Sequence, residues 1–171
     1  ETLRRSGRYG GTTNAPIIFA ITGIENALYD IVGKALNVPI YKLLGGKYRD
    51  KIRLYADCHA GESHEPQAYA EKALEVIAEG YSAVKFDVDS IGVGKLDPYN
   101  YTVGAKEMSH IINVIETTKT AVGSDIDLAI DCHGQFDLPS AITLAKAVEP
   151  LRLLWLEEPV PAENIQALAQ I

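Results

Sequence analysis

The sequence predicts an α/β fold in which a parallel sheet is covered by helices. After about residue 50, short apolar or alternating segments typical of strands take turns with segments of helical periodicity. Four such strand–helix units in succession, with short connections, require parallel strands joined by crossover helices. This order favours part of a closed (β/α) barrel, with an open doubly wound sheet as the alternative. No GxGxxG sequence follows the first strand, so a nucleotide-binding sheet has no support.

The beginning of the chain predicts helices rather than strands. Residues 1–15 are polar and glycine-rich, which is typical of a loop. Apolar residues at helical spacing then predict a helix over residues 16–37, which Val38-Pro39 ends. A second turn closes at Gly45-Gly46. We therefore expect a helical hairpin here.

The rest of the chain is expected to alternate between strands and helices. The strands are predicted over residues 52–58, 82–88, 127–133 and 151–157. The helices are predicted over residues 66–79, 103–122, 139–148 and from 162 onward. The chain starts without a methionine or signal peptide and stops inside a helix-like pattern, so we expect a fragment of a longer protein.

Composition and charge argue against several classes of function. Hydrophobic residues make up 47% of the 171 residues and charged residues 23%, as in ordinary globular proteins. The net charge of −7 argues against nucleic acid or an anionic membrane as a partner. No apolar run approaches the roughly 20 residues of a membrane-spanning helix. Cys58 and Cys132 form no CxxC pair, which favours a reduced, cytoplasmic setting.

Polar residues follow each predicted strand at the end where a parallel barrel places its active site. Residues i and i+2 of a strand share a face, and the apolar face should pack on the helices. On the second strand this leaves Lys85 and Asp87 pointing inward. On the third strand it leaves Asp131 and His133 pointing inward. These four side chains are therefore expected to meet at the mouth of the barrel.

The outer two strands are less clear. On the fourth, parity alone leaves open whether Glu157 or Glu158 points inward. On the first, we expect the apolar set to point inward, which would bring Cys58 to the mouth, with His59 at the following turn. Both residues are candidates to line a substrate pocket, and packing is an equally good explanation for them.

Two carboxylates on neighbouring strands predict a metal site. Asp131 and Glu157, if both face inward, would lie roughly 5 Å apart across the ladder. Carboxylates this close repel each other unless one is protonated or a cation lies between them. Oxygen ligands of this kind suit Mg²⁺.

Five segments carry a resemblance to a known family. They are residues 20–34 (AITGIENALYDIVGK), 39–46 (PIYKLLGG), 84–87 (VKFD), 130–131 (ID) and 155–159 (WLEEP). In this order they resemble the enolase superfamily, mandelate racemase and muconate lactonizing enzyme type. The resemblance implies a partial (β/α) TIM-type barrel, the first four βα units over residues 51–171. Before it, residues 1–50 would be the C-terminal helical part of an α+β capping domain.

The resemblance also implies roles for individual residues. Asp131 and Glu157 would be metal ligands, which decides the parity question in favour of Glu157, and Mg²⁺ would be the cofactor. Lys85 would be catalytic. The third metal ligand and a His–Asp base pair would lie on the fifth, seventh and sixth strands, after Ile171.

Departures from the family pattern narrow the expected activity. Asp87 stands where the racemases and lactonizing enzymes have a second lysine, so the usual lysine base is absent. An Asp-x-His at Asp131 and His133 resembles the sugar acid dehydratases that act on galactonate, gluconate and mannonate. There the histidine protonates the departing hydroxide. The predicted activity is removal of the C2 proton of an aldonate, stabilisation of an enediolate on Mg²⁺ and loss of the C3 hydroxyl, giving a 2-keto-3-deoxy acid.

Several alternatives stay open. The full-length protein is expected to be a homo-oligomer that binds a small-molecule sugar acid, with a racemase or epimerase of the same superfamily as the competing enzyme. A non-catalytic half barrel is the alternative from another class, and the 171 residues alone are expected to be inactive. His133 could cap a turn, and Asp87 could pair with Lys85, contact the substrate or hold a loop.

Overall fold

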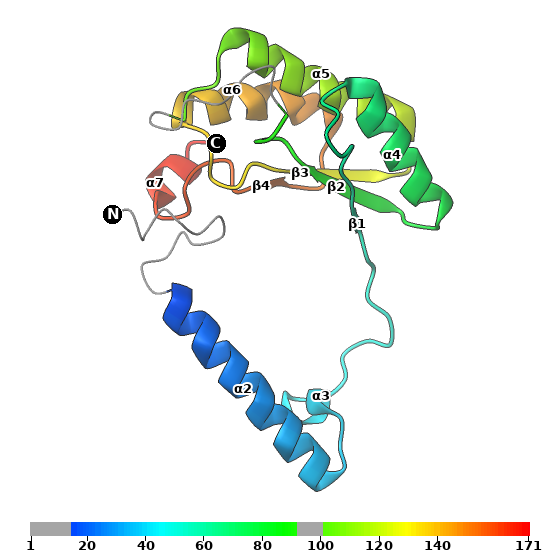
Figure 1. Cartoon of the computed structure of the whole chain (residues 1–171), viewed down its shortest axis with the longest axis vertical. Coiled ribbons are helices and arrows are strands. Elements are labelled where there is room, and N and C mark those ends of the chain that lie inside the picture. Colours follow the sequence, from blue (N-terminus) through cyan, green and yellow to red (C-terminus); the bar gives the residue numbers. More distant parts are fainter. Residues whose placement is uncertain (1–14, 92–100) are drawn as a thin grey trace. The chain divides into compact units, whose positions relative to one another are not determined.

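The computed structural model of the chain describes residues 15–91 and 101–171 (Figure 1). The loop expected over residues 1–15 therefore lies, except for its last residue, outside the described residues. The chain divides into two compact units, Glu1–Arg53 and Leu54–Ile171, which are described separately.

The first unit contains a long helix followed by one turn of a second. The helices α2 (Ala15–Leu36) and α3 (Ile40–Leu43) confirm the predicted helical hairpin. The chain reverses between them because Asn37 adopts a left-handed backbone with φ of 53°, and the Val38 N–H donates to the Gly33 carbonyl. A Cβ at Gly33 would lie 3.1 Å from the Val38 carbonyl oxygen, so glycine permits this close turn.

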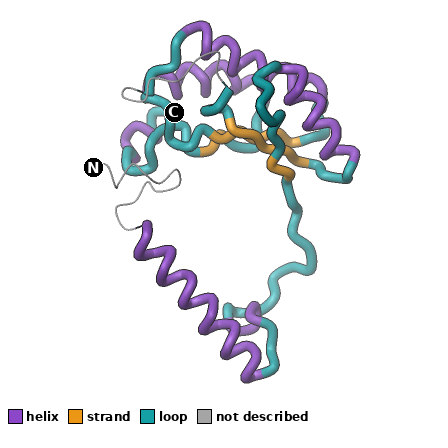
Figure 2. Tube along the Cα trace, in the orientation of Figure 1, coloured by secondary structure: helices purple, strands orange, loops and turns teal. Residues whose placement is uncertain are grey.

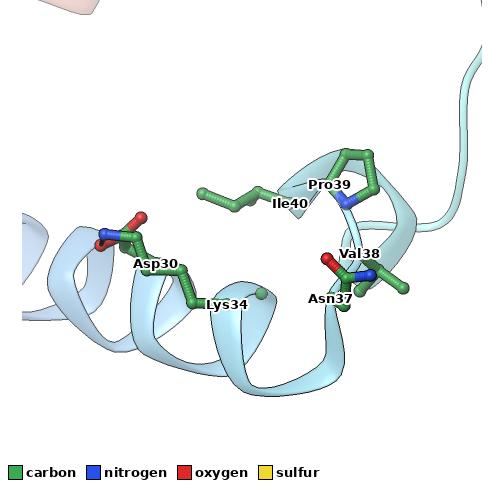
Figure 3. A pocket seen from close by; sticks show the side chains of 7 residues that line it. Asp30, Lys34, Asn37, Val38, Pro39 and Ile40 are labelled. Atoms are coloured by element: carbon green, nitrogen blue, oxygen red, sulfur yellow. Dashed lines mark hydrogen bonds and ion pairs between the residues drawn. The ribbon is translucent and has the colours of Figure 1, made fainter.

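A shallow depression lies beside this turn (Figure 3). Asp30, Lys34, Asn37 and Pro39 are among the residues that line it, and Lys34 forms an exposed ion pair with Asp30 one turn earlier. It contains none of the residues predicted for the site. None of the helices in the described ranges has the length and apolar character needed to cross a lipid bilayer.

The second unit is built on a parallel sheet of four strands in the order β1-β2-β3-β4, so each strand pairs with the next one along the chain. Helices connect the strands (Figure 2). The strands are β1 (Ala56–Asp57), β2 (Ala83–Asp87), β3 (Asp127–Asp131) and β4 (Leu156–Glu157). The helices are α4 (Pro66–Ala78), α5 (Ala105–Val122), α6 (Leu138–Val148), the 3₁₀ turn η1 (Glu149–Leu151) and α7 (Ile165–Leu168).

Local sequence explains where these helices begin and end. Pro66 occupies the first position of α4, where a missing N–H is harmless. The Asp137 carboxylate caps α6 by accepting a hydrogen bond from the Ser140 N–H at 2.8 Å. At the C-terminal end of α5, Gly123 takes a φ of 78°, a positive value that glycine adopts without a Cβ clash.

The two faces of the sheet have different environments. Val84 and Phe86 of β2 and Leu128 and Ile130 of β3 are fully buried, in one cluster with apolar residues of α4, α5 and α6. These three helices cover the same face (Figure 1). A sheet in sequential order with its helices on one face is part of a (β/α) barrel, whereas a doubly wound sheet is covered on both faces. The partial-barrel prediction is therefore confirmed.

The strands are shorter than predicted, above all at the edges of the sheet. Residues 52–58 and 151–157 were expected to form strands, but β1 and β4 have two residues each. Among the described strands each edge strand has a neighbour on one side only, so fewer of its backbone groups form hydrogen bonds within the sheet. The inner strands β2 and β3 keep five residues each.

The expected orientation of Cys58 is wrong. Cys58 follows Ala56, which pairs with Val84 on the helix-covered face, and both belong to the hydrophobic core. Cys58 is only 2% exposed, and this burial raises the pKa of its thiol to about 11. The apolar side of the first strand packs on helices as it does in the other strands, so Cys58 does not line the mouth.

Candidate active site

The register of the sheet gathers four of the predicted polar residues, together with Asp57, on the face opposite the helices. Asp57 pairs with Lys85, and Asp87 pairs with Asp131, which in turn pairs with Glu157. Paired residues of neighbouring strands point to the same side. The five side chains therefore share one face at the carboxyl ends of four strands, which is where barrels carry their active sites.

Lys85 lies at the centre of this group. Its residue is 7% exposed, and its Nζ donates to Asp131 Oδ2 at 2.9 Å. The same Nζ lies 3.8 Å from Glu157 Oε2 and 3.8 Å from Asp87 Oδ1. Burial disfavours the ammonium, but the hydrogen bond and the negative charge of Asp131 outweigh it and raise the pKa of Lys85. Lys85 is thus a fixed positive charge among carboxylates.

The two carboxylates predicted as ligands are held by further hydrogen bonds. Asp131 is 4% exposed, and its Oδ1 accepts from the backbone N–H of His133 at 3.0 Å. Glu157 is more open, and its Oε2 accepts from the Trp155 indole N–H at 3.0 Å. Both carboxylates therefore keep defined orientations on adjacent strands.

The donor chemistry at this pair fits a hard cation. Two carboxylates stand opposite each other in the ladder, and the Lys85 ammonium already supplies positive charge to both. Oxygen ligands of this type suit Mg²⁺, which commonly takes one or two protein carboxylates and completes its shell with water and substrate oxygens. Asp131 and Glu157 could therefore form the protein side of a magnesium site.

Two groups of three residues in the described ranges have ligand atoms close enough to share a cation. They are Asp57 with His59 and Asp87, and Asp87 with Asp89 and His133. Neither group includes Asp131 or Glu157. The pair of Asp131 and Glu157 fits a magnesium ion better than either group, because it consists of carboxylates alone, whereas histidine is a poor ligand for magnesium.

His133 projects into the same group from a turn just after β3. Its backbone has a φ of 47°, and Gly134 follows with a φ of 63°, so the chain turns sharply here. Its Nδ1 lies 3.1 Å from Asp89 Oδ1, while its Nε2 lies 3.4 Å from Asp131 Oδ2 and 3.8 Å from Asp87 Oδ1. Burial opposes the charge of His133, but hydrogen bonding to Asp89 and the three carboxylates raise the pKa of its imidazole.

His59 and Asp87 also come together. The His59 Nε2 lies 3.7 Å from Asp87 Oδ2 and 3.5 Å from Asp57 Oδ1, and the His59 side chain is half exposed. Burial raises the pKa of Asp87 despite the nearby positive charges. These two residues border the site where a ligand could reach them, and a role in substrate binding stays a prediction for both.

Besides Asp57, two contributors to the site were not predicted from the sequence. Trp155 was given no role there, but its indole N–H donates to Glu157, two residues further along the same face. Asp89 was not considered because it lies beyond the end of β2. Lys85, Asp87 and Asp89 follow one another at intervals of two residues, and this spacing was a usable signal for Asp89.

Comparisons with known proteins agree with this architecture. Residues 4–45 match the family described as mandelate racemase / muconate lactonizing enzyme, N-terminal domain, and residues 68–171 match the family described as enolase C-terminal domain-like. A D-xylonate dehydratase from Haloferax volcanii is 44% identical over 155 residues, covering 90% of this chain and 38% of the relative. A D-gluconate dehydratase from Thermoproteus tenax is 37% identical, covering 86% of this chain and 28% of the relative.

A solved structure shows the same likeness in three dimensions. A mandelate racemase/muconate lactonizing enzyme-like protein from Rubrobacter xylanophilus has 40% sequence identity and a TM-score of 0.76. The match covers 84% of this chain and 40% of that protein. The chain thus spans well under half the length of the proteins it matches.

Proposed function

Because the chain belongs to the mandelate racemase and muconate lactonizing enzyme family of the enolase superfamily, we propose that the full-length protein is a magnesium-dependent dehydratase of sugar acids. The substrate class is an aldonate, a carboxylate with hydroxyls on C2 and C3. The names of the relatives, D-xylonate dehydratase and D-gluconate dehydratase, support this class. The product would be a 2-keto-3-deoxy acid and water.

One observation carries the proposal. Asp131 and Glu157 face each other in the ladder, and His133 lies two residues from Asp131 on the same side, with its Nε2 3.4 Å from Asp131 Oδ2. A group that binds a cation and a group that exchanges protons are therefore adjacent. Loss of hydroxide beside a carboxylate needs this combination, because the C2 proton is weakly acidic and hydroxide leaves poorly without a proton.

Asp131 and Glu157 would hold the metal ion, and the family resemblance places a third ligand on a later strand. Bound Mg²⁺ would supply positive charge opposite the negative charge that develops on the substrate carboxylate. Lys85 would add a second positive charge at the same place. Its ammonium is fixed 2.9 Å from Asp131 Oδ2 and needs no reorganisation when the substrate charge develops.

His133 would act as the general acid. The C2–H bond breaks as its proton passes to a base, which the resemblance places on the later strands. The C3–O bond breaks as the hydroxide takes a proton from His133 Nε2 and leaves as water. A C2–C3 double bond forms, and the resulting enol converts to the keto acid. General acid assistance of this kind is worth roughly 10²–10⁴ in rate.

The proposal is tested with the full-length protein and a set of aldonates that includes D-xylonate and D-gluconate. We expect Mg²⁺-dependent formation of a keto acid, which chelator abolishes. Asp131→Asn should weaken both Mg²⁺ binding, measured by calorimetry, and turnover. Asp125→Asn is the matched control, because Asp125 is an exposed aspartate before the opposite end of β3.

The same experiment separates the alternatives. A racemase or epimerase would exchange the C2 proton for deuterium in deuterated water, or invert the centre, without making a keto acid. A non-catalytic protein would do neither. Unchanged Mg²⁺ affinity in Asp131→Asn would refute the assigned metal site.

A further inference from the structure

Building on the proposed dehydratase function, we propose that Asp89 is a positioning residue that orients the imidazole of His133 for proton donation. Asp89 belongs to the turn directly after β2, and its Oδ1 lies 3.1 Å from His133 Nδ1. Both side chains are buried, with 9% of Asp89 and 6% of His133 exposed. The contact is therefore little screened by solvent.

The distances distinguish the two ring nitrogens of His133. Nδ1 faces Asp89, the nearest of the three carboxylates around the ring. Nε2 faces Asp131 and Asp87, at 3.4 and 3.8 Å, and so points toward the predicted metal site and the substrate. An aspartate at Nδ1 accepts its proton and keeps that nitrogen in the N–H form, so the other nitrogen is left to exchange a proton with the substrate.

Asp89 is itself held firmly enough to orient another group. Val88 and Ile91, on either side of it, are buried in the hydrophobic core. The Val88 N–H donates to the Asp131 carbonyl at 2.8 Å, and the Ile91 N–H donates to the Val88 carbonyl at 3.3 Å. The turn that carries Asp89 is thereby fastened to the strand that leads to His133.

His133 needs such a partner because its backbone lies in the left-handed region, at the start of a turn. β3 ends at Asp131, so strand pairing does not fix the direction of the His133 ring, and a ring rotated by half a turn would present the other nitrogen to the substrate. A single carboxylate hydrogen bond at Nδ1 removes this ambiguity. The Asp89 contact comes from a different βα unit, so it fixes the ring relative to both strands.

The test uses full-length protein with three variants: Asp89→Asn, Asp89→Glu and the control Asp125→Asn. We expect Asp89→Asn to lower kcat for keto-acid formation by at least about tenfold, because an amide can hold the imidazole in the wrong tautomer. KM and Mg²⁺ affinity should stay within about twofold of the wild type. Asp89→Glu, which restores a carboxylate, should recover part of kcat, and Asp125→Asn should change nothing.

Nitrogen-15 NMR of the His133 imidazole supplies a readout that does not depend on turnover. The Nδ1–H form should be lost in Asp89→Asn and kept in Asp125→Asn. If the wild-type protein makes no keto acid from any aldonate, the proposed function fails, and this spectrum still decides the role of Asp89.

Three results would overturn the inference. The first is an Asp89→Asn variant with wild-type kcat and an unchanged His133 spectrum. The second is a parallel loss of kcat, substrate binding and Mg²⁺ affinity, which would indicate general damage to the turn. The third is a second Mg²⁺ bound per chain that Asp89→Asn removes, because Asp89 would then be a ligand.

Discussion

Lys85→Met would test whether the ammonium at the centre of the site is the counter-ion of its carboxylates. At an effective dielectric constant of about 20, unit charges 2.9 Å apart, as in the Lys85–Asp131 pair, attract by about 6 kcal/mol. At 3.8 Å, the separation from Glu157, the attraction is about 4 kcal/mol. Desolvation of the ammonium offsets much of this, and removing one partner of a buried pair destabilises a protein by about 3–5 kcal/mol.

We therefore expect Lys85→Met to lower the free energy of unfolding of the metal-free protein by about 3 kcal/mol, the low end of that range. Asp131 keeps its hydrogen bond from the His133 backbone, which limits the loss. With saturating Mg²⁺ the difference should shrink, because another cation then neutralises the same carboxylates. Mg²⁺ should also bind more tightly to the variant, since a repelling charge is gone, while turnover falls by about 10²-fold.

The assay is urea denaturation of the full-length protein followed by circular dichroism, in chelator and in Mg²⁺, with calorimetry for the metal. Lys34→Met is the control, because Lys34 forms an exposed ion pair with Asp30 that is worth less than about 0.5 kcal/mol. Metal-free Lys85→Met protein that unfolds within 0.5 kcal/mol of the wild type would refute the counter-ion role. So would weaker Mg²⁺ binding in this variant.

Two further predictions concern the turn after β3. His133→Asn should keep Mg²⁺ affinity, because asparagine tolerates the left-handed backbone at this position. It should lower keto-acid formation by about 10²–10⁴-fold. Formation near the wild-type rate, measured by a keto-acid assay, would rule out the general acid role. Gly134→Ala should lower the free energy of unfolding by about 1–3 kcal/mol, because a Cβ would combine a φ of 63° with a 3.3 Å contact to the Pro161 Cα. Gly61→Ala measures the backbone effect alone, because Gly61 has a φ of 67° and, apart from its chain neighbours, no described residue comes within 4 Å of the added Cβ. Equal losses in the two variants by urea denaturation would show that the contact to Pro161 has no effect.

The sequence was sufficient to predict the sheet and the inner part of the site because both depend on local patterns. The apolar residues of β2 and β3 alternate with Lys85, Asp87 and Asp131, so their orientation follows from strand geometry once the apolar face is assigned to the helices. The same rule, applied consistently, would also have placed Cys58 correctly. The error arose because the apolar side of the first strand was assigned to the barrel interior instead.

The lengths of the edge strands and the position of Asp89 depend on contacts that a sequence pattern does not contain. The lengths of β1 and β4 depend on pairing partners, and each has a neighbour on one side only among the described strands. The position of Asp89 depends on a turn, where strand parity no longer applies strictly. Its contact with His133 joins residues 44 apart in sequence, and only the folded sheet brings them together.

Backbone hydrogen bonds between neighbouring strands have a consequence for how this site can change over time. The Val88 N–H donates to the carbonyl of Asp131, and the Cys132 N–H donates to the carbonyl of Glu157. Backbone hydrogen bonds between strands are therefore made at the two candidate ligands themselves. The spacing between the two carboxylates is therefore set by the main chain, whatever side chains the neighbouring loops carry. Loops at this edge of the sheet could lengthen, shorten or exchange residues without moving the two carboxylates apart. Such a scaffold would let related proteins differ in these loops while the spacing of the two carboxylates is kept.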